Sequence, residues 1–494
     1  MPEVHTYLAI DLGAESGRTM LGTFAGEKLT LIEKHRFPNG PVRLPDGLHW
    51  DVLRLWDEVK AGVAATVKSG VEPSSLGVDT WAVDFALLDK NGALLGNPFH
   101  YRDSRTDGMI DEAFRHISKE ELFANTGIQF LQLNTLYQLL AMVREKSPIL
   151  EIAQTFVTIP DLFNYWLCGE ITNEFTNATT TQCLDPIKRD WSQLVLNAMG
   201  IPAHLFGSIT APGTQIGTLL PDIAEETGAG EVKVVLPACH DTGSAVVAVP
   251  AKNQDFAWIS SGTWSIMGAE VKDPSLGETA LAYNFTNEGG VFDTWRLSKN
   301  IMGLWLVQEC RRDWQRRGQD QSYDEMIRLA AESEAFLAVI NPDDDAFFHP
   351  GDMPERIRQH CQKTGQCVPQ TKGEVLRVAL ESLALKYRWV LERTEELCGK
   401  QLNPIHIIGG GTKNHLLSQF TADATGRRVI TGPVEATAIG NVLMQAIGLG
   451  HLNSLAEART VVRNSFEVEE YHPGNREGWD EAYEKLLELL DFAT

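Results

Sequence analysis

The chain has 494 residues, 43% of them hydrophobic and 22% charged, a composition typical of a folded protein of two or three domains. Its formal net charge of −23 at pH 7 argues against nucleic acid and anionic membranes as partners, because both would repel it. No run approaches the ~18–20 apolar residues of a membrane helix, and the N-terminus lacks the basic and apolar regions of a signal peptide. We therefore expect a cytoplasmic protein.

Seven cysteines occur at irregular spacing, without a CxxC pair or a zinc-ligand pattern. A sparse, odd set is typical of a reduced cytoplasmic protein. Cys361 and Cys367 are close enough in sequence for a disulfide, although two free thiols are the commoner state of such a pair in the cytosol.

The first half of the chain alternates strands with helices. Short apolar or alternating runs separated by glycine turns predict strands, and longer amphipathic runs predict helices. The predicted strands are 7–10, 18–24, 29–37, a pair of strands over 76–88, and 232–236. The predicted helices include 52–68, 133–145 and 162–168. The threonine-rich segment 176–182 is expected to be irregular.

The second half starts with a hairpin at 257–268, whose strand–turn–strand pattern resembles that of 10–22 and suggests two related halves. Thr371 and Glu374 predict a capped start for a helix over 372–398, which Gly399 ends. Further predicted elements are strands 405–408 and 428–430, helices 414–424 and 433–447, and an amphipathic helix at 475–490. We place the boundary near Pro250, which gives domains 1–249 and 250–494.

Three turns rich in glycine could approach a phosphate, because no side chain blocks their N–H groups. In the first, Asp11 ends a strand and could hold Mg²⁺ through water, and Arg18 could add charge. The second, 260–265, could supply donors from the other side of a polyphosphate. An ordinary hairpin turn remains the alternative for both.

In the third turn, strand 405–408 runs into Gly409, Gly410 and Gly411 and then a helix, where a flat heterocycle or a phosphate could lie. A tight turn would explain one glycine but not three. The chain contains no P-loop motif, and no GxGxxG follows its first strand, which argues against a P-loop enzyme and a dinucleotide oxidoreductase.

A strand ends at residue 236 and the sequence continues as Pro-Ala-Cys-His-Asp-Thr-Gly-Ser over 237–244. Asp241 could accept a proton from a substrate hydroxyl. A helix N-cap remains the alternative for Asp241, and a satisfied core histidine for His240. No GxSxG elbow occurs, which argues against a serine hydrolase.

Two acids, Asp79 and Asp84, flank Trp81 on a short strand. Acids beside an aromatic ring suit sugar recognition. Without further context, however, the pattern favours an edge strand with solvated acids.

These segments together resemble the FGGY carbohydrate kinases over nearly the whole chain, from Tyr7 to about Gly448. The segments that carry the resemblance are AIDLGAESGR (9–18), DTWAVDFALLD (79–89), YRDSRT (101–106), IQFLQLNTLYQL (128–139), TNATTTQ (176–182), HDTGSAV (240–246), SSGTWSIMG (260–268), NEGG (287–290), KNIMGLWLVQ (299–308), IIGGG (407–411) and GPVEATAIGN (432–441). TNATTTQ and KNIMGLWL are more specific than any glycine turn. The resemblance implies an α/β fold of two actin-like ATPase (ribonuclease H-like) domains with an interdomain active-site cleft.

The resemblance also implies roles for single residues. Asp241 is expected to be the general base, and the ketose pocket is expected to contain Ala82, His240, Asp241, Thr242 and Asn300. The expected nucleotide contacts are Ala14, Glu15, Ser16, Gly17, Arg18, Thr263, Gln308 and Gly410. Two positions depart from the family pattern: Glu15 stands where serine is usual, and Ala82 where glycine is usual. An acid at position 15 should point to Mg²⁺ or to solvent.

The implied reaction is phosphorylation of the C1 hydroxyl of a ketose by MgATP, with L-rhamnulose as the expected substrate. The alternatives are another ketose such as L-fuculose or L-ribulose, a non-catalytic sugar or nucleotide sensor, and an ATP-driven chaperone or filament protein. We expect a monomer or a homodimer.

Overall fold

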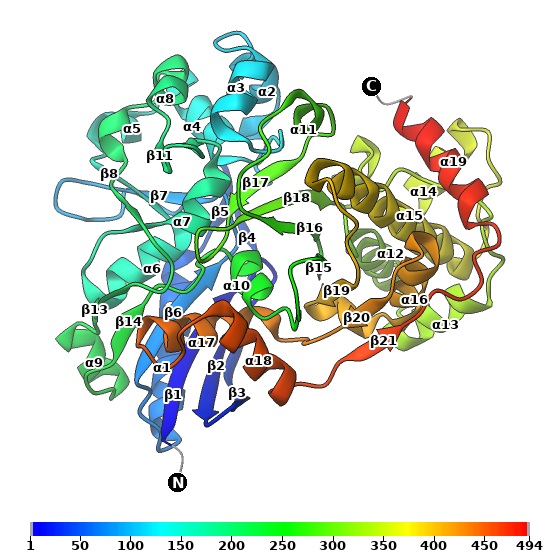
Figure 1. Cartoon of the computed structure of the whole chain (residues 1–494). Coiled ribbons are helices and arrows are strands. Elements are labelled where there is room, and N and C mark those ends of the chain that lie inside the picture. Colours follow the sequence, from blue (N-terminus) through cyan, green and yellow to red (C-terminus); the bar gives the residue numbers. More distant parts are fainter. Residues whose placement is uncertain (1–2, 492–494) are drawn as a thin grey trace. The chain divides into compact units, whose positions relative to one another are not determined.

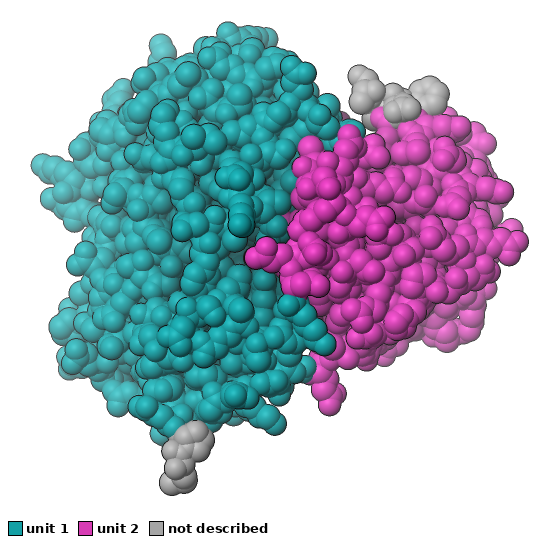
Figure 2. All heavy atoms as spheres, viewed as in Figure 1, with its two compact units in different colours: residues 1–252, 270–297, 436–466 teal, residues 253–269, 298–435, 467–494 magenta. Residues whose placement is uncertain are grey.

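The computed structural model describes residues 3–491, which form two compact units (Figure 2). Of the described residues, unit 1 comprises 3–252, 270–297 and 436–466, and unit 2 comprises 253–269, 298–435 and 467–491. The chain therefore passes between the units several times. Strands β16 (Ser265–Val271) and β18 (Trp295–Ile301) each run from one unit into the other.

Unit 1 is built on a six-stranded sheet of order β13-β14-β6-β1-β2-β3 (Figure 1). The strands are β1 (Val4–Leu12), β2 (Ser16–Ala25), β3 (Lys28–Pro38), β6 (Ser75–Thr80), β13 (Gln215–Thr218) and β14 (Lys233–Val235). β1, β2 and β3 form an antiparallel meander, whereas β6 pairs parallel with both β1 and β14. The strands predicted at 7–10, 18–24, 29–37 and 232–236 are confirmed in this sheet. The pair predicted over 76–88 is found as β6 and β7 (Phe85–Leu88), but β7 pairs with β8 (Thr155–Thr158) in a separate two-stranded sheet.

Helices cover the sheet because β1 is apolar on both faces. Leu8, Ile10 and Leu12 belong to one buried cluster with Leu55 and Val59 of helix α1 (Val52–Lys68). Helix α17 (Ala436–Gly448) also contacts β1 and β6, and Gln445 Nε2 donates a 3.1 Å hydrogen bond to the carbonyl of Leu8.

The contacts of α17 explain why residues 436–466 pack in unit 1 although they lie late in the chain. Residues 270–297 also belong to unit 1. The compact units are thus discontinuous and differ from the continuous halves 1–249 and 250–494 in these two segments.

The second sheet has the order β17-β18-β16-β15-β19-β20-β21. Its strands besides β16 and β18 are β15 (Ala257–Ser261), β17 (Thr286–Gly289), β19 (Ile405–Ile408), β20 (Val429–Thr431) and β21 (Glu469–Tyr471). The predicted hairpin is confirmed: β15 pairs antiparallel with β16 and parallel with β19. β1 has the same pair of neighbours, antiparallel β2 and parallel β6, so the internal similarity extends to strand order.

Helix α15 (Lys372–Cys398) has the predicted capping box and ends at Gly399 in the left-handed conformation. Five side chains that recur at helical spacing along α15 are each at most 2% exposed: Leu376, Leu380, Leu383, Tyr387 and Leu391. Helix α16 (His415–Thr425) follows the glycine turn. The helix predicted to start at Pro433 begins three residues later, at Ala436.

The remaining elements are short. In unit 1 they are β4 (Pro41–Leu44), β5 (Gly47–Trp50), β7 (Phe85–Leu88), η1 (Ser104–Thr106), α2 (Met109–Ala113), α3 (Lys119–Thr126), α4 (Thr135–Arg144), α5 (Pro148–Ile152), β8 (Thr155–Thr158), α6 (Ile159–Cys168), β9 (Asn173–Glu174), α7 (Phe175–Ala178), η2 (Thr179–Thr181), β10 (Leu184–Asp185), β11 (Asp190–Trp191), α8 (Gln193–Met199), η3 (Ala203–Leu205), β12 (Ile209–Thr210), α9 (Pro221–Thr227), α10 (Asp241–Val247), α11 (Glu278–Ala282) and α18 (Leu455–Ser465). In unit 2 they are α12 (Trp305–Arg316), α13 (Tyr323–Glu332), η4 (Asp345–Phe347), α14 (Met353–Lys363), η5 (Gly410–Lys413) and α19 (Trp479–Asp491).

The expectation of an irregular segment at 176–182 is wrong, because α7 and η2 make it helical and buried. The three consecutive threonines each donate a side-chain hydrogen bond to a carbonyl three residues earlier, at 3.1, 2.7 and 2.6 Å. Hydroxyls that bond the local backbone in this way need no partner elsewhere. A polar run can therefore be packed inside the unit.

Cys361 and Cys367 are both free thiols, the first buried and the second exposed. None of the helices in residues 3–491 is long and apolar enough to cross a membrane.

Candidate functional site

Three acids lie at the carboxyl ends of neighbouring strands in unit 1. Asp11 and Asp79 are register partners in the parallel pair β1–β6. Thr80 forms a parallel bridge with His240, which places Asp241 at the same edge of the sheet. The carboxyl ends of parallel strands are where open α/β sheets bind ligands.

The expectation of solvated acids on an edge strand at 79–84 is wrong. β6 is an inner strand between β14 and β1, and Asp79 and Asp84 are 0% and 1% exposed. Asp84 accepts hydrogen bonds from the indole N–H groups of Trp50 and Trp81, at 2.5 and 3.0 Å, and from Gln138 at 2.8 Å. Burial raises the pKa of Asp84 to about 6, so at neutral pH it is an ionised acceptor that joins core side chains.

Asp79 has a different environment. Burial, and then the nearby charge of Asp11, raise the pKa of Asp79 well above its usual value, although a hydrogen bond from Asn441 opposes the rise. A raised pKa is the expected response of two adjacent buried carboxyl groups, because their like charges repel each other.

The first glycine turn is fixed by its neighbours. Arg18 donates to Asp11 Oδ2 from Nε at 2.9 Å and from Nη2 at 2.7 Å. Asn39 Nδ2 donates to the carbonyl of Gly13 at 2.8 Å. A Cβ on Gly17 would lie 2.2 Å from the Phe37 ring, so this glycine is required for packing. Glu15 is exposed, as expected for an acid at that position.

Helix α10 begins at Asp241, and its N-cap is His240, so the N-cap alternative for Asp241 is wrong. The Asp241 side chain is 32% exposed, and its Oδ1 accepts from the backbone N–H and the hydroxyl of Thr242 at 2.5 and 3.2 Å. Burial raises the pKa of Asp241; His240 opposes the rise and Asp11 adds to it. A raised pKa suits a group that must take up a proton.

His240 is 4% exposed and surrounded by charged groups. Its Nδ1 lies 2.9 Å from Arg296 Nη2 and 3.3 Å from Glu288 Oε2, and its Nε2 lies 3.3 Å from Asp241 Oδ1. A buried and partnered histidine was the structural alternative, and this description is confirmed. The partners include the candidate base, so the histidine is also part of the candidate site.

The backbone beside Ala82 is strained. Val83 has φ 66°, and a β-branched residue in the left-handed region is a genuine outlier. Its N–H donates to Thr180 Oγ1 at 3.3 Å, and its carbonyl accepts from the hydroxyl of Thr135 at 2.5 Å. Strain maintained by surrounding contacts clusters at ligand sites, which supports a binding role for this turn.

The glycines of unit 2 differ in what they pack against. Gly409 has φ +87°, and a Cβ on Gly411 would lie 2.0 Å from Ser261 Oγ, so the turn itself requires both. A Cβ on Gly410 would meet no heavy atom within 4 Å, which leaves space above its backbone. In α12, the buried Gln308 Oε1 has no hydrogen-bond partner among the described residues. An open glycine backbone and an unsatisfied acceptor both suit a nucleotide.

The second phosphate turn is tied to α12. The N–H groups of Leu304 and Trp305 donate to the carbonyls of Gly262 and Thr263 at 3.1 and 3.0 Å. Asn300 lies on β18, close in sequence to this helix, and is half-buried.

The predicted site residues divide between the units. Unit 1 contains Asp11, Ala14, Glu15, Ser16, Gly17, Arg18, Ala82, His240, Asp241 and Thr242, whereas unit 2 contains Thr263, Asn300, Gln308 and Gly410. Sequence reasoning assigned no role to Glu288, Arg296 or Asn441, which contact predicted site residues or strand-end acids. Arg296 could have been found as a charge within the otherwise apolar start of strand WRLSKNI.

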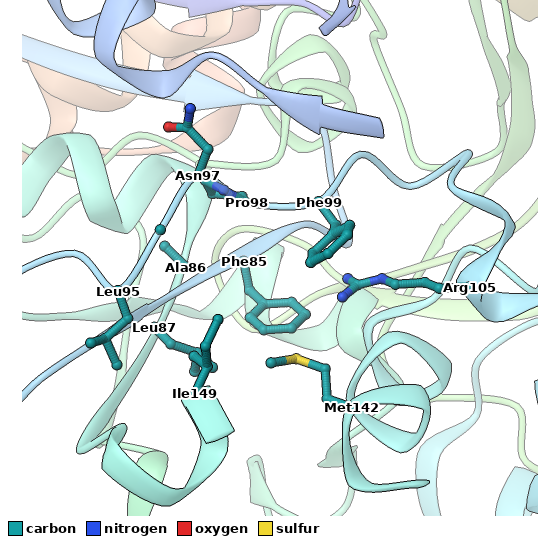
Figure 3. Close-up of a pocket in the computed structure, with 11 residues that line it drawn as sticks. Phe85, Ala86, Leu87, Leu95, Asn97, Pro98, Phe99, Arg105, Met142 and Ile149 are labelled. Carbon is teal, nitrogen blue, oxygen red and sulfur yellow. The ribbon is translucent and has the colours of Figure 1, made fainter. Parts of the chain in front are cut away.

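A separate hollow in unit 1 contains none of the predicted site residues. Figure 3 shows Arg105 pointing toward Phe99 above a largely apolar lining that includes Phe85, Met142 and Ile149. The Arg105 guanidinium lies 3.9 Å from the Phe99 ring centre and donates to Gln138 at 2.8 Å. So apolar a lining does not suit a polyhydroxylated sugar.

Among residues 3–491, no group of three or more His, Cys, Asp and Glu side chains is arranged to hold a metal ion. A cation at this site would therefore need other ligands, such as water or phosphate oxygens.

The chain is similar to known carbohydrate kinases in sequence and in fold. The N- and C-terminal domains of the FGGY family of carbohydrate kinases match residues 6–248 and 257–449. A rhamnulokinase of Bacteroides thetaiotaomicron is 43% identical and covers 97% of this chain and 98% of its own. A rhamnulokinase of Oceanobacillus iheyensis is 42% identical, over 95% of this chain and 99% of its own length. The structure of a xylulose kinase from Lactobacillus acidophilus superposes with a TM-score of 0.81 at 15% identity, over 99% of this chain and 97% of that one, a likeness of fold.

Proposed function

Because the chain belongs to the FGGY family of carbohydrate kinases, we propose that it transfers the γ-phosphoryl group of ATP to the C1 hydroxyl of L-rhamnulose, in rhamnose catabolism. The observation that carries the substrate is the near-full-length identity to rhamnulokinases. A cytoplasmic location and a monomeric or homodimeric state remain predictions.

Asp241 is the proposed general base. Its partly exposed carboxylate at the strand ends can accept the C1 hydroxyl proton while the oxygen attacks the γ-phosphorus and ADP leaves. His240, Thr242 and Ala82, with Asn300 of unit 2, are the proposed ketose contacts. Thr242 is also positioned to orient the base, since it donates twice to Asp241 Oδ1.

The residues present fit ATP. The open backbone at Gly410 and the unsatisfied Gln308 Oε1 offer a surface and an acceptor for the nucleotide. Ala14 to Arg18 and Thr263 are the proposed phosphate contacts. Arg18, held by Asp11, would lend positive charge in a strongly acidic chain.

The donor set also fits Mg²⁺. This ion is usually held by one or two carboxylates together with waters and substrate phosphates, and Asp11 would hold it through water. When bound, Mg²⁺ neutralises charge on the phosphates.

Two alternatives remain testable. Another ketose, such as L-fuculose or L-ribulose, could be preferred if the extra methyl of Ala82 reshapes the pocket. A non-catalytic sugar sensor would keep the fold without turnover, although the buried network around Asp241 favours a reacting group.

A coupled ADP-release assay with MgATP distinguishes them. The panel is L-rhamnulose, L-fuculose, L-ribulose, D-xylulose and glycerol. The proposal predicts the highest kcat/KM with L-rhamnulose. A higher value with another ketose would transfer the assignment to that sugar, and no ADP with any of them would support the sensor.

A further inference from the structure

The buried pair of Arg296 and Glu288 lies behind the candidate base. Arg296 is 1% exposed and Glu288 5%. Arg296 Nη2 lies 3.1 Å from Glu288 Oε2, and Arg296 Nε donates to the carbonyl of Gly289 at 2.9 Å. The guanidinium is therefore fixed from two sides, and its Nη2 reaches His240 Nδ1 at 2.9 Å.

This contact determines where the histidine proton lies. A guanidinium has only donors, so His240 Nδ1 must be the acceptor in the contact with Arg296. A proton on Nδ1 would face this N–H group at 2.9 Å, a closer contact than the 3.3 Å from Nδ1 to Glu288 Oε2, and would be repelled by it. The ring therefore carries its proton on Nε2, which lies 3.3 Å from Asp241 Oδ1.

The two oxygens of Asp241 then differ. Oδ1 faces three donors, namely the backbone N–H and hydroxyl of Thr242 and the Nε2–H of His240. Oδ2 forms no hydrogen bond or ion pair with any residue in 3–491, and the side chain is partly exposed. Oδ2 is thus the oxygen available to a substrate hydroxyl.

We propose that Arg296 and Glu288 are positioning residues that fix the Nε2–H tautomer of His240, which orients Asp241 so that its Oδ2 accepts the substrate proton. This inference rests on the proposed function in taking Asp241 as the base. In the step, the O–H bond of the substrate breaks, its proton passes to Oδ2, the new O–P bond forms and the bond from phosphorus to ADP breaks.

The first test is spectroscopic and uses the unmodified full-length protein. Histidine labelled with ¹⁵N reports which ring nitrogen carries the proton, and the His240 signals are assigned by their loss in His240→Gln. The proposal predicts a bare Nδ1 and a protonated Nε2. A proton on Nδ1 overturns it, whatever the variants do.

The second test compares two double variants. Each removes both buried charges, because a single buried charge left without its partner would itself destabilise the protein strongly. Arg296→Met with Glu288→Leu leaves no donor to Nδ1, whereas Arg296→Gln with Glu288→Leu supplies an amide N–H. We expect kcat to fall about 10²-fold in the first at a nearly constant KM for the ketose, and to recover in part in the second. Equal losses in both would contradict a tautomer role.

A matched control removes another ion pair of unit 1. Arg459 Nη2 lies 2.6 Å from Glu270 Oε2, with side-chain exposures of 8% and 12%. Arg459→Met with Glu270→Leu should leave kcat unchanged.

The failures of the two proposals are distinguishable. Full activity in Asp241→Asn would overturn the assignment of Asp241 as the general base, whereas the measured tautomer of His240 would be unaffected. A protonated Nδ1 in an active kinase would remove only the positioning role. If neither double variant folds, the spectrum of the unmodified protein still decides.

Discussion

Asn441 Nδ2 donates a 2.5 Å hydrogen bond to Asp79 Oδ2, joining two fully buried residues that are 362 positions apart. The same amide group donates to the carbonyl of Gly77 at 3.1 Å. The contact connects α17 to the strand that ends at the acid cluster, and it gives a structural role to the last residue of the GPVEATAIGN segment.

Removing this amide should destabilise unit 1. Asn441→Ala leaves the Asp79 carboxyl and the Gly77 carbonyl without their donor, and we expect the free energy of unfolding to fall by about 1–3 kcal/mol. Urea denaturation measures it. Asn197→Ala, on an exposed position of α8, is the control and should stay within about 0.5 kcal/mol of the parent protein. An equal effect in both variants would mean that the bond contributes nothing.

Asp84 should make stability depend on pH. Its pKa is raised from 3.8 to about 6, so the native state holds the proton more tightly than the unfolded chain does. The stabilisation is therefore complete below about pH 4 and is lost as the pH rises through about 6, a change on the order of 3 kcal/mol. Asp84→Asn should flatten the fall in unfolding free energy between pH 4 and 6, whereas exposed Asp222→Asn should keep it. A slope in Asp84→Asn as steep as in the parent would exclude this origin.

Thr180 should support the strained turn at Val83, which adjoins the proposed ketose contact Ala82. Thr180→Val removes the acceptor for the buried N–H of Val83, so we expect a higher KM for the ketose and a loss of about 1–3 kcal/mol in unfolding free energy. Thr180→Ser keeps the hydroxyl and should retain most of both properties. Steady-state kinetics and urea denaturation test this, and an unchanged KM in the valine variant would show that the turn does not shape the pocket.

Substitutions at the adjacent glycines Gly410 and Gly411 should distinguish an effect on nucleotide binding from an effect on packing. In Gly410→Ala the new methyl meets no protein atom, so the protein should unfold as the parent does but show a raised KM for ATP. In Gly411→Ala the methyl would lie 2.0 Å from Ser261 Oγ, so stability itself should fall. If Gly410→Ala binds ATP as well as the parent, the nucleotide does not lie over this backbone.

Much of the fold could be predicted because local patterns agree with packing. Helices 52–68 and 372–398 and strand 405–408 have the predicted bounds, since apolar period, caps and glycine ends all indicate the same limits. The threonine run was misjudged because hydroxyl bonds to its own backbone satisfy it in the interior.

Long-range pairing explains the other errors. The acids of 79–84 seemed solvated because their partners, Asn441, Trp50 and Gln138, lie far away in sequence. Glu288 and Arg296 were missed for the same reason. From the sequence alone, a charged residue in a strand such as Arg296 is expected to be exposed. Only the structure shows that Glu288 and His240 lie beside it in the interior.

Phosphoryl transfer from MgATP to L-rhamnulose, measured for the parent protein and for Asp241→Asn, is the decisive experiment. We expect turnover by the parent and a loss of about 10²–10⁴-fold in kcat in the variant, with an unchanged fold and nearly unchanged ketose binding. Turnover in Asp241→Asn within about threefold of the parent would contradict the general base, since such groups contribute far more than that.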